Sequence, residues 1–163
     1  MSVLGAVLMT VSSYVSVPMY PVPITAQTLT VLLLGAFAGP RLGVVSVLVW
    51  IAIAAAGLPV LSDGAGGLEA LSGPTAGYIA GFPIAAYLAG VAERTFPSSS
   101  LRLFAAFLVA HLVILGLGWA WLSRIVGPAT ALEVGVTPFL IGAVIKSALA
   151  LLAIAIWRYR TGS

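Results

Sequence analysis

This sequence contains no cysteine and very little charge. Its 163 residues include seven Lys or Arg, four Asp or Glu and one His, so that charged residues make up 7% of the chain. The absence of cysteine excludes disulfides, thiolate chemistry and cysteine-ligated metal sites. Four scattered carboxylates and a single histidine also argue against a metal site of any other kind. We therefore expect neither a metal nor a cofactor.

Apolar residues take the place of the missing charge. They make up 61% of the chain, and the mean hydropathy is +1.19. A soluble domain carries about 25% charged residues, so this composition leaves too little polar surface to face water. It predicts an integral membrane protein whose residues 1–163 form one membrane-embedded domain. The net charge of +3 fits basic flanks of membrane helices better than nucleic-acid binding.

The apolar residues gather in six runs, which predict an all-α protein of about six transmembrane helices. The second run is shorter than the about 20 residues needed to cross a bilayer. Its first residues are therefore expected to begin below the membrane surface. The runs cover residues 1–17, 27–39, 42–56, 74–92, 101–123 and 137–157.

The arginines predict the orientation of these helices. Six crossings put both termini on one side, and cytoplasmic loops carry an excess of Lys and Arg. With cytoplasmic N and C termini, only Arg124 lies outside, beside Asp63, Glu69 and Glu133. The arginines then assigned to the cytoplasm are Arg41, Arg94, Arg102, Arg158 and Arg160.

Two irregular segments face outward in this orientation and are predicted to cover a ligand pocket near the extracellular side. The segment 17–27 holds three prolines and is expected to be extended, because a helix cannot continue through them. The segment 57–81 is rich in glycine, which permits turns and close backbone approaches. Its Gly66 and Gly67 are candidate ligand-binding residues, and Pro74 is the predicted start of the next helix.

Lys146 is the residue that most clearly indicates a ligand-binding site. It lies inside the sixth run, about 12 Å from the nearer end, where a cation costs on the order of 3 kcal/mol or more. No Asp or Glu lies within any of the six runs. We interpret the missing anion as the ligand. The alternative is that Lys146 pairs with helix-end carbonyls or with water.

Neutral polar side chains cluster near the outward loops. Such groups suit an uncharged polar head, for example an amide or a urea, without the desolvation penalty of a fixed charge. Trp50 and Tyr20 are predicted either to stack on an apolar ligand body or to anchor the protein at the lipid interface. His111 is predicted to be a neutral packing residue. The neutral candidates for ligand contact are Thr25, Gln27, Thr28, Thr75 and Tyr78.

The first run carries small residues at every fourth position, Ser2, Ala6 and Thr10. Small residues at this spacing let two membrane helices approach closely. The stripe serves either packing within the chain or docking onto a partner subunit.

An enzyme is the weakest of the functional hypotheses. No nucleophile elbow or phosphate-binding loop is present, so the chain has no nucleotide site of its own. A membrane enzyme acting on a lipid would have to rely on Asp63 and Glu69.

Five segments together resemble the BioY family, the biotin-specific S-components of ECF-type vitamin transporters. The segment at 64–83 is the most specific, and the five follow the family's order along nearly the whole chain. They are PVPITAQT at 21–28, LLLGAFAGPRLG at 32–43, GLPV at 57–60, GAGGLEALSGPTAGYIAGFP at 64–83 and PFLIGAVIK at 138–146.

The resemblance implies a six-helix S-component in the plasma membrane of a prokaryote, which captures biotin from outside. Transport would then use an ECF transmembrane coupling protein and a pair of ABC-type ATPases, although some members are thought to work without them. The stripe at Ser2, Ala6 and Thr10 resembles the motif by which S-components dock on the coupling protein. The resemblance also implies that the chain is not an enzyme.

One residue departs from the family pattern. Before the lysine the family commonly has Gly-Asp-x-x-Lys, whereas this chain has Gly142 and Ala143 before Lys146. The missing Asp removes a possible acceptor for the ureido ring of biotin. An S-component for another small carboxylated vitamin is therefore the main alternative.

Overall fold

The computed structural model describes residues 2–161, which form eight α-helices, a short 3₁₀ helix and a two-stranded hairpin. The six apolar runs each become a helix, as predicted. The helices are α1 (Ser2–Tyr14), α2 (Gln27–Ala38), α3 (Pro40–Ala55), α4 (Gly67–Leu71), α5 (Ala76–Thr95), α6 (Ser100–Val126), α7 (Pro128–Gly135) and α8 (Thr137–Thr161). The strands are β1 (Ser16–Val17) and β2 (Ile24–Thr25), and the 3₁₀ helix is η1 (Ser62–Gly64).

The helices fall into two length classes. Within residues 2–161, α5, α6 and the stretch formed by α7 and α8 are long and apolar enough to cross a membrane, whereas α1, α2 and α3 are shorter apolar helices. These three have 13, 12 and 16 residues, or about 18 to 24 Å at 1.5 Å per residue. A bilayer's hydrocarbon core is about 30 Å thick. The irregular segments that follow α1 and α3 therefore must satisfy their backbone groups within the protein.

The proline-rich segment between α1 and α2 satisfies part of its backbone hydrogen bonding by forming a small antiparallel hairpin. Ser16 pairs with Thr25, and Val17 pairs with Ile24. The amide of Ala26 then donates to the carbonyl of Val15 over 2.9 Å. The segment is extended, as predicted, and its last residues lead directly into the first turn of α2.

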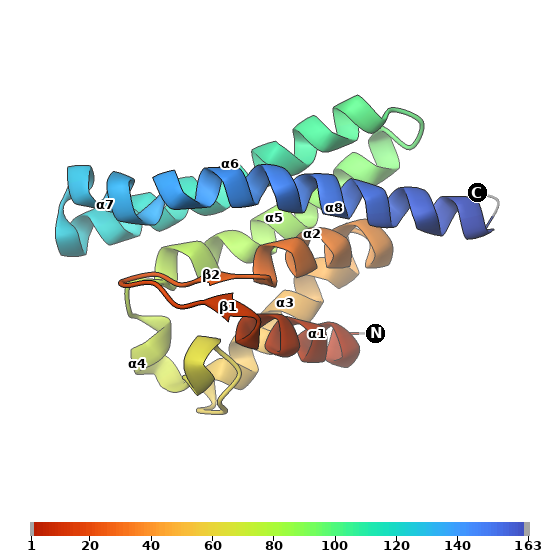
Figure 1. Ribbon diagram of the computed structural model, residues 1–163. Helices are drawn as coiled ribbons and strands as arrows, with labels where there is room; N and C mark the ends of the chain where they lie inside the picture. Colours follow the sequence, from red (N-terminus) through yellow and green to blue (C-terminus); the bar gives the residue numbers. More distant parts are fainter. Residues whose placement is uncertain (1, 162–163) are drawn as a thin grey trace.

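Both ends of the described chain lie at one end of the bundle, together with the connection between α5 and α6 (Figure 1). Arg158 near the end of α8 forms an ion pair of 2.8 Å with Glu93 of α5 and donates to the carbonyl of Pro97. The β1–β2 hairpin, α4 and α7 lie at the opposite end (Figure 1). The arginines predicted to be cytoplasmic therefore share one end, and the two irregular segments share the other.

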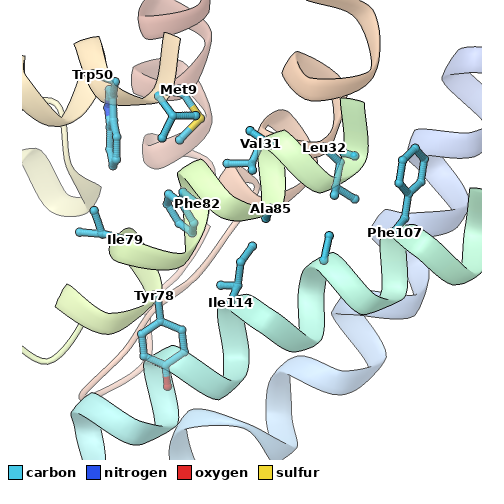
Figure 2. Packing of buried hydrophobic residues seen from close by; sticks show 14 of the residues in the cluster. Met9, Val31, Leu32, Trp50, Tyr78, Ile79, Phe82, Ala85, Phe107 and Ile114 are labelled. Atoms are coloured by element: carbon cyan, nitrogen blue, oxygen red, sulfur yellow. The ribbon is translucent and has the colours of Figure 1, made fainter. Parts of the chain in front are cut away.

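Helix α5 lies at the centre of the packing. Glycines at its contacts allow the backbones of α2 and α6 to come close to it. A side chain at Gly35 of α2 would collide with the carbonyl of Ala86 of α5, and one at Gly77 of α5 would collide with the carbonyl of Leu117 of α6. Phe82 and Ala85 of α5 lie between residues of α3 and α6 in the core (Figure 2). Large apolar side chains remain exposed on the outside of the bundle, as expected for a surface in contact with lipid.

The helices differ from the prediction at three places. Helix α5 begins at Ala76 rather than at Pro74, because Gly73 and Pro74 form a turn closed by a 3.1 Å hydrogen bond from the amide of Ala76 to the carbonyl of Gly73. The glycine-rich segment is not one loop, since it contains η1 and α4. The connection before α8, predicted as a loop, holds α7.

The small-residue stripe on α1 turns partly inward. Ala6 is only 2% exposed and belongs to the core, whereas Ser2 and Thr10 are partly buried. At neighbouring Gly5 a side chain would meet Ser46 of α3. Ala6 therefore packs within the chain, and a partner subunit cannot contact it directly.

Candidate ligand-binding site

A mostly apolar cavity lies beside the hairpin end of the bundle, where β2, α2, α3, α5, α6 and α8 meet. Its volume is about 70 Å³. Seven of the nine predicted ligand-binding residues line it: Thr25, Gln27, Thr28, Trp50, Thr75, Tyr78 and Lys146. The sequence placed these seven on five separate segments, and the fold brings them to one cavity. The remaining lining residues are Val22, Pro23, Leu61, Ser62, Ile79, Phe82, His111, Ile114, Leu115, Phe139 and Ala143.

Lys146 is the cation of this cavity. Its Nζ donates to the carbonyl oxygen of Thr25 over 2.5 Å and to Oγ1 of Thr28 over 3.1 Å. Both partners are neutral, and no carboxylate belongs to the lining. The contact with the carbonyl matches the alternative interpretation of Lys146. The ammonium group of Lys146 therefore has no carboxylate partner among the described residues that line the cavity.

Gln27 lies beside Lys146 in the first turn of α2 and is 6% exposed. The hydroxyl of Thr25 accepts from the backbone amide of Gln27 and donates to its Oε1, both over 3.3 Å. The amide nitrogen Nε2 of Gln27 is buried and has no hydrogen-bond partner within residues 2–161. Two N–H donors therefore remain without an acceptor at a buried position.

His111 of α6 is the lining residue that the sequence interpretation missed. It was predicted to be a packing residue, and its Nδ1 does lie 3.2 Å from the carbonyl oxygen of Phe107 and 3.1 Å from Oγ of Ser147. Its Nε2, however, is buried without a partner among the described residues. A lone histidine on an apolar helix gives no sequence signal that distinguishes these two situations.

Trp50 fixes the wall that the glycine-rich segment contributes. It is fully buried, and its Nε1 donates to the carbonyl of Val60 over 3.1 Å. Ser13 of α1 donates to the same oxygen over 2.9 Å. Trp50 therefore lies inside the protein and not at the lipid interface. Tyr20, its predicted companion, is 93% exposed and does not line the cavity.

We predict that Trp50→Phe speeds the release of a bound ligand. The variant keeps an aromatic ring in the wall but loses one of two hydrogen bonds that hold Val60, at about 1 kcal/mol. The release rate should therefore rise about fivefold, measured by exchange of labelled ligand. Trp119→Phe is the matched control, because Nε1 of Trp119 donates to Pro128 outside the cavity. An equal release rate in both variants would refute this role of Trp50.

Tyr78 joins the cavity to the end of the bundle that carries α7. Its hydroxyl donates to the carbonyl of Gly135 over 2.8 Å, and its ring stacks on Phe139 with 6.1 Å between the centroids. Its polar atom is therefore occupied by the protein, and Tyr78 presents its ring to the cavity. Thr75 lies at the N-cap of the same helix.

Gly66 and Gly67 are not brought to the cavity. At Gly66 a side chain would collide with the carbonyl of Leu58, and Gly67 has a φ of +89°. Both glycines thus shape the turn into α4. The sequence analysis interpreted these glycines as places where a ligand approaches the backbone. In the structure, the backbone of Leu58 makes this close approach at Gly66.

Comparison with known proteins adds a second line of observation. The family model of the BioY family matches residues 1–162. The chain belongs to the BioY family. Among its relatives, a probable biotin transporter BioY of Pyrococcus horikoshii is 39% identical over 145 residues, which cover 89% of this chain and 86% of the relative. The biotin transporter BioY of Rhizobium etli is 36% identical over 147 residues, covering 85% and 79%.

A solved structure shows the same fold. The 2.1 Å crystal structure of the S-component for biotin from an ECF-type ABC transporter superposes with a TM-score of 0.87. The sequences are 25% identical, and the match covers 97% of this chain and 88% of the other. The predicted S-component fold is therefore confirmed. Because BioY relatives are named transporters, family membership decides against the membrane enzyme hypothesis.

Proposed function

We propose that this BioY chain is the membrane subunit that captures biotin for uptake. One observation in the cavity carries the proposal beyond family membership: Lys146 is a cation held only by neutral oxygens in an otherwise uncharged cavity. A buried charge without a counter-ion is unfavourable. A ligand that brings one carboxylate supplies the missing anion.

The rest of the cavity suits the rest of biotin. The molecule has a neutral ureido ring, an apolar thiophane and valeryl chain, and one carboxylate. Trp50, Ile79 and Phe82 offer apolar and aromatic surface to the ring and the chain. The amide of Gln27 and the hydroxyls of Thr28 and Thr75 offer neutral polar contacts, and Lys146 pairs with the carboxylate.

Entry of biotin requires the site to expand. The cavity of about 70 Å³ is well below the about 300 Å³ at which sites for drug-sized ligands begin. Two irregular segments form part of the cavity wall. The hairpin contributes Val22 and Pro23, and the glycine-rich segment contributes Leu61 and Ser62. We place the movement in these segments, because the other walls are helices packed in the core.

The protein belongs to the plasma membrane of a prokaryote and crosses it several times, with both termini in the cytoplasm. The ends of α5 and α8 support this orientation, because Arg94, Arg158 and Arg160 share one end of the bundle, and positive charge accumulates on the cytoplasmic side. The cavity then lies nearer the outer face, where biotin arrives.

Release into the cell uses an ECF coupling protein and ABC-type ATPases. Because Ala6 is buried, docking cannot use the small-residue stripe as a continuous face. Beside it, a groove of about 340 Å³ runs between α1 and α2. Leu4 and Leu8 line it from α1, and Leu33 and Phe37 line it from α2. We place the contact with the coupling protein in this groove.

Leu8→Trp tests the groove. The side chain of Leu8 is 45% exposed, so the larger ring fills the groove without entering the core. We expect biotin binding to stay within about twofold of the unchanged protein, and uptake that depends on the ATPase module to fall about tenfold or more. Val109→Trp, at a 52% exposed position of α6 away from the groove, is the control. Unchanged uptake by Leu8→Trp would rule out docking at this site.

The proposed function itself is tested by uptake of labelled biotin. Cells that lack their own biotin transporter should accumulate biotin when they express this chain with an ECF module, and not when they express the module alone. Accumulation of another small carboxylic acid, with none of biotin, would instead favour the alternative substrate class.

A further inference from the structure

Two buried nitrogen atoms in the cavity have no partner, and they come from different helices. Nε2 of His111 lies on α6 and Nε2 of Gln27 on α2, and both side chains line the same cavity. His111 is 3% exposed and Gln27 is 6% exposed. Buried polar groups in proteins are almost always hydrogen-bonded, and leaving one unpaired costs about 1 to 3 kcal/mol. Two such groups on side chains that line one cavity point to a ligand that satisfies both.

The surroundings of His111 determine what its Nε2 can offer. The carbonyl oxygen of Phe107, 3.2 Å from Nδ1, can only accept a hydrogen bond. We assign the proton to Nδ1, because a lone pair there would face the lone pairs of that oxygen, and the hydroxyl of Ser147, 3.1 Å away, can accept as well as donate. In the neutral ring this leaves Nε2 as an acceptor.

The surroundings of Gln27 determine the opposite role. The hydroxyl of Thr25 accepts from the backbone amide of Gln27 and gives its own hydrogen to Oε1. We assign the oxygen to the end of the side chain that faces Thr25, since the hydroxyl of Thr25 has a hydrogen to donate, and the NH₂ group to the unpaired end. Gln27 thus presents two donors, and His111 presents one acceptor.

We infer that His111 and Gln27 together recognise an N–H and C=O pair of the ligand, as found in an amide or a cyclic urea. His111 accepts from the ligand N–H, and Gln27 donates to the ligand carbonyl. For biotin, which the proposed function assigns to this cavity, the pair is the ureido group. Ala143, which also lines the cavity, contributes no polar atom of its side chain. His111 reaches the cavity from the facing helix and provides the acceptor.

The test compares three substitutions of His111 by calorimetry of the purified protein with biotin. His111→Phe keeps a ring of similar size without a polar atom and should weaken binding about 10- to 100-fold. His111→Asn retains a polar group near the position of Nδ1 but none at Nε2, so it should lose as much. His111→Gln places an oxygen near the position of Nε2 and should recover most of the affinity.

Altered ligands separate this recognition from the charge contact at Lys146. Biotin methyl ester keeps the ureido group but has no carboxylate, so His111→Phe should weaken the ester and biotin by the same factor. Methylation of a ureido nitrogen should weaken binding to the unchanged protein about tenfold or more and to His111→Phe by much less. This ligand comparison decides the matter even if a His111 variant fails to fold, because methylation also tests the unchanged protein.

The outcomes are distinct. If the unchanged protein does not bind biotin, the proposed function fails. If it binds biotin but folded His111→Phe binds within twofold of it, or if methylation of neither ureido nitrogen weakens binding, the role of His111 is overturned. Loss of affinity in His111→Phe and His111→Asn with recovery in His111→Gln supports it.

Discussion

Lys146→Met is expected to weaken biotin binding about 100-fold or more. The variant leaves the carboxylate of the ligand buried without a counter-ion, and breaking a buried ion pair costs about 3 to 5 kcal/mol. That corresponds to a factor of about 10² to 5 × 10³ in the dissociation constant. Methionine keeps a long side chain, so the wall of the cavity stays filled. Calorimetry on the purified variant measures the effect.

Three measurements distinguish the loss of the charge contact from a loss of structure. Removing a buried cation that has no anion should leave the melting temperature unchanged or raise it. Arg102→Met, which removes a cation outside the cavity, should bind biotin like the unchanged protein. Biotin methyl ester should bind equally to Lys146→Met and to the unchanged protein. A folded Lys146→Met variant with an unaltered dissociation constant would remove Lys146 from the site.

Gly77→Leu is expected to disrupt the bundle. A side chain at Gly77 would meet the carbonyl of Leu117 and Cβ of Trp121, so α5 and α6 could not keep their separation. Overpacking costs about 1 to 3 kcal/mol where neighbours can shift, and the main chain of Leu117 has little freedom to do so. We expect a lower melting temperature in detergent and loss of biotin binding, because the next residue, Tyr78, lines the cavity.

Gly116→Leu is the matched control. Gly116 lies on α6 and no atom lies within 4 Å of a side chain added there. Leucine also favours a helix over glycine, so this variant should melt at the same temperature or higher. If Gly77→Leu retained both the melting temperature and the biotin affinity of the unchanged protein, close packing of α5 on α6 would not be required.

The membrane class and the helices could be predicted because long apolar runs have few other structures available in lipid. The same pattern located Lys146, since a charge inside such a run is conspicuous. Helix α7 was missed because it is short, and the connection that contains it was not treated as an apolar run. Pro128 at its first turn is the signal that was available.

The differences between the predicted and the observed positions of the site residues have physical causes. Gly66 and Gly67 were assigned to the ligand because a close backbone approach has the same sequence signal whether a ligand or Leu58 is the neighbour. For Ala6 the sequence left packing within the chain and docking onto a partner both open, because small residues favour contact with any helix, including α3 of the same chain. His111 was predicted to be a packing residue because the sequence of α6 alone does not show that its Nε2 lacks a partner.

The central claim is that this cavity binds biotin, and titration of the purified protein in detergent tests it most directly. Calorimetry with biotin, desthiobiotin and thiamine in turn separates the ureido acid from an unrelated vitamin. We predict tight binding of biotin, weaker binding of desthiobiotin, which keeps the ureido group and the carboxylate but lacks the sulfur, and no binding of thiamine. Absence of a biotin signal from folded protein, or equal binding of thiamine, would contradict the account.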